Sequence, residues 1–429
     1  MRNGRETTDW NGQKGIDMAA DTQLDVDFCR SHFPALDTGW VFLENAGGTL
    51  VPRQVTDRLG HFTAACQVQP GEGYPASEEG ARMIEEGKAT LAALINAEID
   101  EIVVGPSTTS NVYALSHALR PQFEAGDEII VTNQDHEANN GAWRALEATG
   151  LVVREWRMNA DTDDLEIEDL EELLNPRTRL VCFTHCSNIV GLVHDVKAIT
   201  AKVHAAGAMV CVDGVAYAPH RRIDVKALDV DFYLYSPYKV FGPHMGVLYG
   251  KRAALVRAAN QSHYFLGDDD HQRRLCPGGL NYELTAGSAG IGDYVDAVHA
   301  HHFPGADVDA PERIEKVFGL FAAHETALGR RIEDFLGAQP SIRVIGASAP
   351  ADRERVGVYS FLVDGRDSRE IPAALRERKI GLHADDFYAA RCIDAIGARP
   401  QNGVVRASLA HYNGSRDVDR LIDGLDRLV

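Results

Sequence analysis

Between about residues 40 and 249, short apolar runs alternate with amphipathic stretches that are long enough to be helices. Several of the runs are apolar throughout, as expected for strands that are covered on both faces. The expected strands are 101–104, 128–132, 152–157, 180–184, 209–212 and 232–235, and the helical stretches between them include 108–119, 139–149 and 195–206. This alternation predicts an α/β fold with a parallel or mostly parallel sheet. Ligands of such sheets bind at the carboxyl ends of the strands, so the residues that follow each strand are the first candidates for a site.

The second half of the chain has a different pattern. After a long helical or irregular stretch at about 286–336, apolar runs and amphipathic stretches predict a smaller α+β domain: strands at 342–345, 356–361 and 403–410, and helices at 368–378 and 418–428. The expected organisation is a disordered leader at 1–22, a segment at 23–40 that packs on the small domain, a large domain at 41–295 and a small domain at 296–429.

The charge and the cysteines exclude several classes of protein. The 43 basic and 63 acidic residues give a net charge of −20, which argues against binding to nucleic acid or to an anionic membrane. The sequence has no apolar run of 18 residues and no apolar signal segment before residue 22, where Met18 is an alternative start. The seven cysteines are scattered without zinc-ligand spacing, so we expect no metal and predict reduced thiols in a cytoplasmic protein.

Lys239 and Asp213 each follow a predicted strand. A lysine among aromatic residues and glycines after a buried strand is unusual, although a surface lysine on a connection is the plain alternative. The chemistry of pyridoxal 5′-phosphate (PLP) explains the pair. A lysine amine, whose pKa falls on burial, forms an imine with the cofactor's aldehyde, while a carboxylate keeps the pyridine nitrogen protonated. Ser236, three residues before the lysine, is expected to offer its hydroxyl to the phosphate.

Two further segments follow strands of the same predicted sheet. Thr108 and Thr109 open a helix after the strand 101–104. Hydroxyl and backbone N–H groups at a helix start bind phosphate, or simply cap the helix. His136 follows the strand 128–132 and can stack on a cofactor ring or act as an acid or base.

Asn188 and Arg406 complete the set of candidate residues. Asn188 follows the strand 180–184 and can hydrogen-bond the cofactor's 3′-oxygen, although asparagine is also common in turns. Arg406 lies in an apolar run of the small domain. Its planar guanidinium suits a carboxylate, either of a substrate or of an internal salt bridge.

In this order, the residues resemble the class V aminotransferase and cysteine desulfurase family of PLP enzymes, from about residue 42 to residue 425. The resemblance implies fold-type I architecture, as in aspartate aminotransferase, and a homodimer with active sites near the subunit interface. It also implies the following roles: Lys239 as Schiff-base lysine, Asp213 at the pyridinium, His136 on the ring, Asn188 at the 3′-oxygen, Thr108, Thr109, Ser236 and Tyr238 around the cofactor, and Arg406, Asn45 and Ala46 at the substrate.

The sequence departs from the desulfurase pattern at the thiol. Ala384, in Gly381-Leu-His-Ala384, occupies the place of the nucleophilic cysteine, and Cys392 lies eight residues further on. The family's glutamine after the aspartate is Ala216, its histidine before the lysine is Tyr238, and its threonine toward the partner's phosphate is Gly279. Without a thiolate, the usual persulfide route is not available.

We therefore expect a PLP-dependent lyase that acts on an amino acid, with Lys239 as the base that takes the α-proton. The alternatives are a racemase or epimerase with a second proton donor at Tyr217, Tyr238 or His136, an aminotransferase, a desulfurase that uses Cys392, and a scaffold with vestigial cofactor binding. The charged loop 267–274 is expected to be solvated or to shape specificity, and His383, Asp385 and Asp386 to tune a substrate side chain or cap a helix.

Overall fold

The computed structural model describes residues 22–347 and 353–429. The predicted leader, including Met18, lies outside these residues except for its last position. Within the described part of the chain, no helix is both long and apolar enough to span a bilayer.

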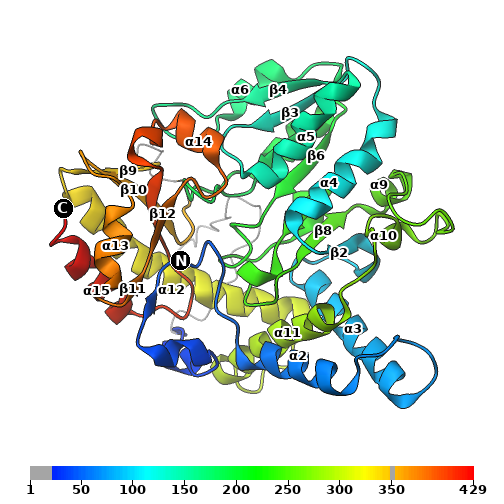
Figure 1. Ribbon diagram of the computed structural model, residues 1–429, viewed down its shortest axis with the longest axis horizontal. Coiled ribbons are helices and arrows are strands. Elements are labelled where there is room, and N and C mark those ends of the chain that lie inside the picture. The colour runs from blue at the N-terminus through cyan, green and yellow to red at the C-terminus, as the bar shows by residue number, and fades with distance from the viewer. Residues whose placement is uncertain (1–21, 348–352) are drawn as a thin grey trace, which may run out of the picture.

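A seven-stranded sheet forms the centre of the large domain (Figure 1). Its order is β2 (Ile102–Gly105), β8 (Gly246–Gly250), β7 (Phe232–Tyr235), β6 (Met209–Asp213), β5 (Thr178–Thr184), β3 (Glu128–Thr132) and β4 (Val152–Trp156). β8 runs antiparallel to both of its neighbours and all other pairs are parallel. The predicted mostly parallel sheet is therefore confirmed, while β8, a short run between glycines, is not among the expected strands.

Apolar residues of successive strand positions point to opposite faces of this sheet. In β3, Ile129 and Val131 belong to one core and Ile130 to the other, as the period of two in a strand requires. Helices α4 (Thr108–Leu119), α5 (Gly141–Arg144) and α9 (Arg252–Arg257) cover the first face, and α3 (Pro75–Ala93), α7 (Val196–Ala205) and α11 (Tyr282–His302) cover the second.

One predicted helix is broken into pieces. Residues 139–149 form short turns around α5 instead of one continuous helix. Asn139 donates a hydrogen bond from Nδ2 to Asp135 Oδ2 (2.8 Å), and Asn140 donates from Nδ2 to the Thr132 carbonyl (2.5 Å). Such side-chain bonds to neighbouring segments compete with a regular helix. The consequence is a compact turn that holds the end of β3 in place.

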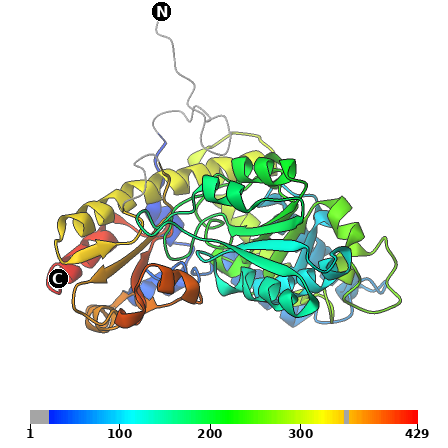
Figure 2. The same ribbon diagram turned by 90° about the horizontal axis from the view of Figure 1, so that it is seen from above.

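The small domain has a four-stranded antiparallel sheet in the order β12 (His383–Asp385), β13 (Val404–Ser408), β10 (Val358–Val363) and β9 (Ile342–Val344). Helices α12 (Ala310–Ala338), α13 (Glu370–Arg376) and α15 (Ser415–Leu425) pack on it. Figure 2 shows α12 lying along the small domain and reaching the large one. The short strand β12 is not among the strands expected from the sequence.

The N-terminal segment joins the two domains. β1 (Val41–Phe42) pairs in parallel with β11 (Ile380–Gly381), and Arg30 forms an ion pair with Asp417 (3.1 Å). Phe28 stacks on His301, near the end of α11. The remaining helices are α1 (Val26–Arg30), α2 (Arg53–Ala65), α6 (Ile167–Leu173), α8 (Val225–Leu228), α10 (His271–Arg274) and α14 (Ala390–Ala395).

Candidate active site

The carboxyl ends of β2, β3, β5, β6 and β7 meet at one edge of the large sheet and enclose a cavity. The residues that line it are Ser107, Thr108, Thr109, Asp135, His136, Ala138, Thr184, Cys186, Asn188, Asp213, Val215, Ala216, Ser236, Tyr238 and Lys239. Eight of the predicted site residues are thus brought together from segments far apart in the sequence. Arg406, Asn45 and Ala46 are not part of this lining.

Lys239 ends a short turn that follows β7, and its side chain is buried. Within the described residues, its amine has neither a hydrogen bond nor an ion pair with any side chain. Burial, together with the nearby positive charge of Arg406, lowers the pKa of Lys239 to about 8. About a tenth of this amine is therefore neutral, and nucleophilic, at pH 7, far more than for a lysine with the ordinary pKa.

Asp213 is the last residue of β6 and shares the cavity with Lys239. Its Oδ1 accepts a hydrogen bond from the Val215 N–H (2.8 Å). Burial raises the pKa of Asp213, and the charge of Lys239 opposes that shift. A buried carboxylate without a full set of partners is ready to accept a proton donor such as a pyridinium N–H.

A second buried carboxylate, Asp135, is not among the predicted site residues. It lines the cavity, accepts a hydrogen bond from the His136 N–H (2.8 Å), and is held by Asn139. Burial and the charge of Asp213 raise the pKa of Asp135. The available signal in the sequence is its position directly before His136, after β3. Asp135 therefore sets the backbone orientation of His136, and its raised pKa favours the protonated, neutral form of this carboxyl beside Asp213.

The start of α4 and the turn after β7 form a polar cradle. The hydroxyls of Thr108 and Ser236 lie 2.6 Å apart, and Ser107 caps the helix by accepting a hydrogen bond from the Ser110 N–H (3.0 Å). Gly246 permits this approach, because a Cβ at that position would lie 2.2 Å from the Thr108 backbone nitrogen. A helix N-terminus with hydroxyls beside it binds phosphate well.

His136 is held as a neutral ring. Its Nδ1 accepts a hydrogen bond from the Ala138 N–H (3.0 Å), which places the proton on Nε2. Burial and the positive charges of Lys239 and Arg406 lower the pKa of His136 to about 3. These properties favour a flat, uncharged surface for stacking over the role of a proton donor near neutral pH.

Asn188 and Arg406 contact each other at the domain boundary. Arg406 Nη1 donates a hydrogen bond to the Asn188 carbonyl (3.1 Å), and Asn188 Nδ2 donates to the carbonyl of Phe387 (3.1 Å). The Asn188 Oδ1 is buried and has no partner among the described residues. The Phe387 ring lies over the Arg406 guanidinium, with the central carbon 3.6 Å from the ring centroid. Phe387 therefore covers one face of the Arg406 guanidinium, while Asn188 links Arg406 to the cavity lining.

Asn45 and Ala46 connect the N-terminal segment to the small domain. Asn45 Nδ2 donates to the carbonyl of Ser408 (2.9 Å), while Asn45 Oδ1 accepts a hydrogen bond from the Tyr412 hydroxyl (2.5 Å). The Ala46 N–H donates to Ser408 Oγ (2.8 Å). The amide of Asn45 is thus engaged in structural contacts, and a role of these two residues at the substrate stays a prediction.

The position of the desulfurase thiol contains no sulfur. Ala384 is the middle residue of β12. Cys392, in α14, is buried, and its burial strongly raises the pKa of the thiol. Cys186 lines the cavity, but its pKa is also raised by burial. All seven cysteines are free and buried. None of them is exposed, as a nucleophilic thiolate usually is.

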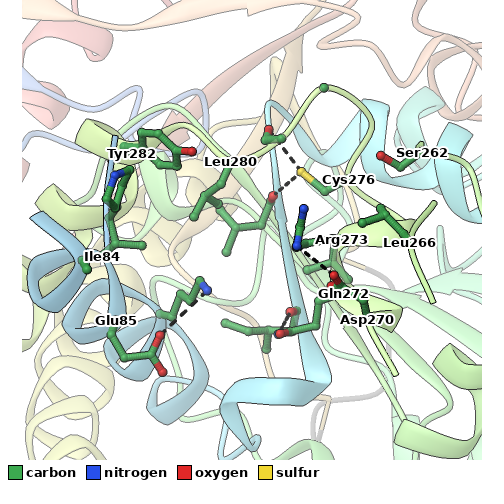
Figure 3. Close-up of a pocket in the computed structure, with 18 of the residues that line it drawn as sticks. Ile84, Glu85, Ser262, Leu266, Asp270, Gln272, Arg273, Cys276, Leu280 and Tyr282 are labelled. Atoms are coloured by element: carbon green, nitrogen blue, oxygen red, sulfur yellow. Dashed lines mark hydrogen bonds and ion pairs between the residues drawn. The ribbon is translucent and has the colours of Figure 1, made fainter. Parts of the chain in front are cut away.

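A second, larger cavity of about 580 Å³ lies between α3 and the segment that precedes α11 (Figure 3). Figure 3 shows Ile84 and Glu85 on one side of it and Arg273 and Cys276 on the other. The charged loop 267–274 lies at this cavity, where Gln272 donates to the carbonyls of Ile99 and Ile102 at the sheet edge (both 2.6 Å). The loop does not line the cavity that contains Lys239.

Comparison with known proteins shows the family. A family model described as aminotransferase class-V matches residues 41–421. An aminotransferase-like protein of Gibberella zeae is 35% identical across 95% of this chain and 99% of that protein. A cysteine desulfurase-like protein of Aspergillus flavus is 33% identical across 98% of this chain and 94% of that protein. The crystal structure of the cysteine desulfurase CsdA from Escherichia coli is 27% identical, with a TM-score of 0.79, over 94% of this chain and 98% of that one.

The chain therefore belongs to the class V aminotransferase family, whose members are PLP-dependent enzymes. The family and the fold-type I architecture predicted from the sequence are confirmed.

The cavity fits the chemical groups of PLP. It presents a buried amine at Lys239, unpaired among the described residues, for the aldehyde and a buried carboxylate at Asp213 for the pyridine nitrogen. The hydroxyls of Thr108 and Ser236 lie at a helix start, where a phosphate is stabilised. The unpartnered polar atom of Asn188 is a further sign that a polar ligand belongs here.

Proposed function

We propose that this chain is a PLP-dependent lyase that acts on an amino acid and removes a substituent from its β-carbon, such as a thiol. The observation that carries the proposal is the pairing of a buried Lys239, whose pKa is lowered, with the buried Asp213 in a cavity that offers no reactive thiol.

Residues of this cavity would hold the cofactor. Lys239 would bind its aldehyde carbon covalently, and Asp213 would accept a hydrogen bond from the ring N–H. Thr108, Ser236 and the N-terminus of α4 would bind the phosphate, with Thr109 and Tyr238 at the cavity wall. His136 would stack on the ring, and Asn188 would direct its amide to the 3′-oxygen. When bound, PLP supplies an electron sink for the electrons released at the substrate's α-carbon.

Lys239 moves the proton. Its neutral amine, when free of the cofactor, would take the substrate's α-proton, which a pKa of about 8 permits near neutral pH. Arg406 binds the α-carboxylate through its planar guanidinium. The β-substituent then leaves with the bonding electrons, for instance as a thiolate, and water converts the remaining three-carbon unit to a keto acid and ammonia.

This route needs a base and an electron sink, but no nucleophilic cysteine. A desulfurase of the usual kind needs a thiolate that reaches the substrate sulfur. Ala384 stands at the corresponding place, and the pKa of the buried Cys392 is raised rather than lowered. The lyase is therefore favoured over a desulfurase that uses Cys392. The racemase is disfavoured at His136, because the pKa of that ring, about 3, leaves it without a second proton to donate.

The test begins with the cofactor. The purified protein is expected to absorb near the visible edge of the ultraviolet, and borohydride followed by peptide mapping is expected to place the reduced cofactor on Lys239. A screen of amino acids then measures sulfide, ammonia, keto acid and deuterium exchange at the α-carbon. Equal amounts of ammonia and keto acid without an added acceptor support the lyase.

Other results contradict the lyase and identify an alternative. Deuterium exchange with inversion and no keto acid indicates a racemase. Keto acid that forms only with an added keto-acid acceptor indicates an aminotransferase. Sulfide together with alanine, lost in Cys392→Ala, indicates a desulfurase that uses Cys392.

The quaternary structure and location are further proposals. We propose a homodimer, as in the family, in a reducing compartment such as the cytoplasm. Seven free, buried cysteines support the reducing compartment. Light scattering on the purified holoenzyme measures the mass, and a single-subunit mass contradicts the dimer.

A further inference from the structure

Arg406 is a buried cation that forms no ion pair within the described residues. Its side chain is 2% exposed. Its Nη1 donates to the Asn188 carbonyl, while Nε is buried without a hydrogen-bond partner in the described part of the chain. A buried guanidinium normally pairs with a carboxylate, because desolvation is costly otherwise. The geometry therefore points to an anion that belongs beside Arg406.

The Phe387 ring takes the place of that anion. It lies face-on to the guanidinium, with the central carbon 3.6 Å from the ring centroid. Phe387 is itself 8% exposed, so the two side chains cover each other. An aromatic face attracts a cation but does not neutralise its charge. A carboxylate that forms two parallel hydrogen bonds binds a guanidinium more strongly.

The segment that carries Phe387 is held in a strained conformation. Phe387 has φ +51° and Tyr388 has φ +57°, which is the left-handed region that bulky side chains rarely adopt. Two backbone contacts hold it on the large domain: the Phe387 carbonyl accepts from Asn188 (3.1 Å), and the Tyr388 carbonyl accepts from the Glu137 N–H (2.7 Å). Strain of this kind persists only where the surroundings impose it, and it clusters at functional sites.

We propose that Phe387 is a specificity-determining residue: its ring covers Arg406 in the free enzyme, and an amino-acid substrate must exchange that ring for its own α-carboxylate. The proposal rests on the proposed function, because it takes Arg406 as the carboxylate-binding group. The displaced ring stays close to the bound substrate, since its segment is tied to Asn188 and to Glu137. Phe387 therefore also limits the size of the substrate side chain.

The free space in the cavity agrees with this exchange. The cavity that contains Lys239 has about 70 Å³ of open volume. Sites for small ligands usually offer about 300 Å³ or more. A neighbouring group that moves would add room for a substrate, and the strained segment at Phe387 is such a group: it is hydrogen-bonded to the lining residue Asn188 and its ring covers Arg406.

The experiment titrates the holoenzyme with glycine and with phenylalanine and follows the cofactor's visible absorbance band. Glycine reports on the carboxylate contact alone, and phenylalanine adds a bulky side chain. In Phe387→Ala no ring competes for Arg406, so the affinity for glycine is expected to rise about threefold to tenfold. The affinity for phenylalanine is expected to rise more than the affinity for glycine. Phe387→Leu keeps bulk but lacks an aromatic face, so its affinity for glycine is expected to rise while its affinity for phenylalanine changes little.

Tyr388→Ala is the matched control. Tyr388 is aromatic, neighbours Phe387 and shares its left-handed backbone, but its side chain is 77% exposed. Its removal is expected to leave the affinity for glycine within twofold of the wild type. A second control, Arg406→Leu with and without Phe387→Ala, is expected to abolish the gain, because the ring then has no guanidinium to cover.

The outcomes separate the two proposals. If the absorbance band is intact and neither Phe387→Ala nor Phe387→Leu raises the affinity for glycine, the inference is wrong while the proposed function stands. The same holds if Tyr388→Ala produces an equal gain. If the wild-type protein shows no cofactor band and borohydride labels no lysine, the proposed function fails, and the inference with it.

Discussion

Two regions meet at the site, and they are built in opposite ways. The floor consists of residues at the ends of regular strands, such as Asp213 at the end of β6 and Lys239 after β7. Asp213 belongs to a strand that is paired on both sides, and Lys239 lies in the short turn that directly follows such a strand. The segment of residues 383–388, from the small domain, ends in two left-handed residues and is held on the large domain by the few contacts of Phe387 and Tyr388.

This structural difference between the two regions suggests a division of roles: one region binds the cofactor and the other selects the substrate. A sheet edge has little freedom, so the groups that face PLP are fixed by topology. A strained segment with few contacts moves at lower cost, and such segments belong to the low-stability parts of a protein. We infer that the floor sets the class of chemistry, while the segment 383–388 sets which amino acid is accepted. Substitutions in each of the two regions test that division.

The largest effect is expected from Lys239→Ala. The variant loses both the covalent attachment of the cofactor and the base, so turnover is expected to fall by about 10³-fold or more. The visible absorbance band should disappear while the circular dichroism spectrum of the fold remains. Lys239→Arg serves as control: it keeps the positive charge but cannot form the imine. If borohydride still fixes the cofactor on a variant that lacks Lys239, another lysine forms the imine.

Asp213→Asn is expected to lower turnover by about 10²-fold or more, because an amide does not hold the proton on the pyridine nitrogen. The same change is expected to stabilise the apoprotein at pH 7 by about 1–3 kcal/mol, since a carboxyl whose pKa is raised by burial is charged there at a cost to folding. That gain fades as the pH falls from the raised pKa of about 6 toward the ordinary value of 3.8, because the folded protein then holds Asp213 protonated and the cost of burying its charge disappears. Urea unfolding of the two apoproteins at pH 7 and at about pH 4 measures this gain. An equal difference in the free energy of unfolding between variant and wild type at both pH values would contradict the raised pKa.

The floor is predictable from the sequence, for a physical reason. Short apolar runs identify strands, and a residue after a parallel strand has only one sheet edge to occupy, so the sequence alone places Thr108, His136, Asn188, Asp213 and Lys239 at that edge. What the sequence does not provide is the contact between domains. The stacking of Phe387 on Arg406 depends on two left-handed residues and on how the small sheet docks, and no local pattern encodes either. The role of Asp135 is also not predictable from the sequence, because its burial beside Asp213 depends on the tertiary fold.

Arg406→Lys is expected to raise KM for amino-acid substrates about tenfold to 100-fold with a smaller change in kcat. A lysine keeps the charge, but it cannot make two parallel hydrogen bonds to a carboxylate. The loading of cofactor, read from the absorbance band, should be unchanged because Arg406 does not line the cavity. If KM stays within twofold, Arg406 is a structural residue and the substrate carboxylate binds elsewhere.

Cofactor uptake by the apoprotein should depend on pH through Lys239. Attack on the aldehyde needs the neutral amine, so the rate is expected to rise with pH, with a midpoint at about 8 in place of the ordinary value near 10.5. Between pH 7 and pH 9 this amounts to about a tenfold increase. In Arg406→Leu, the removal of a nearby positive charge should move the midpoint to higher pH. A midpoint that stays above 10 in the wild type would show that Lys239 is not desolvated.

The smallest effect is expected from Cys392→Ala. This variant tests most directly whether the small domain selects the substrate without taking part in the chemistry. The thiol lies in α14, close in sequence to the strained segment of the site, yet it is buried, and burial raises its pKa. Activity is expected to stay within twofold, with a loss of stability of about 1 kcal/mol from the missing sulfur. Cys186→Ala, at the cavity wall, is the companion variant and should behave alike. A loss of sulfide release in Cys392→Ala alone would show that the segment around α14 opens far enough to present a thiol, and that the small domain contributes to the chemistry as well as to substrate choice.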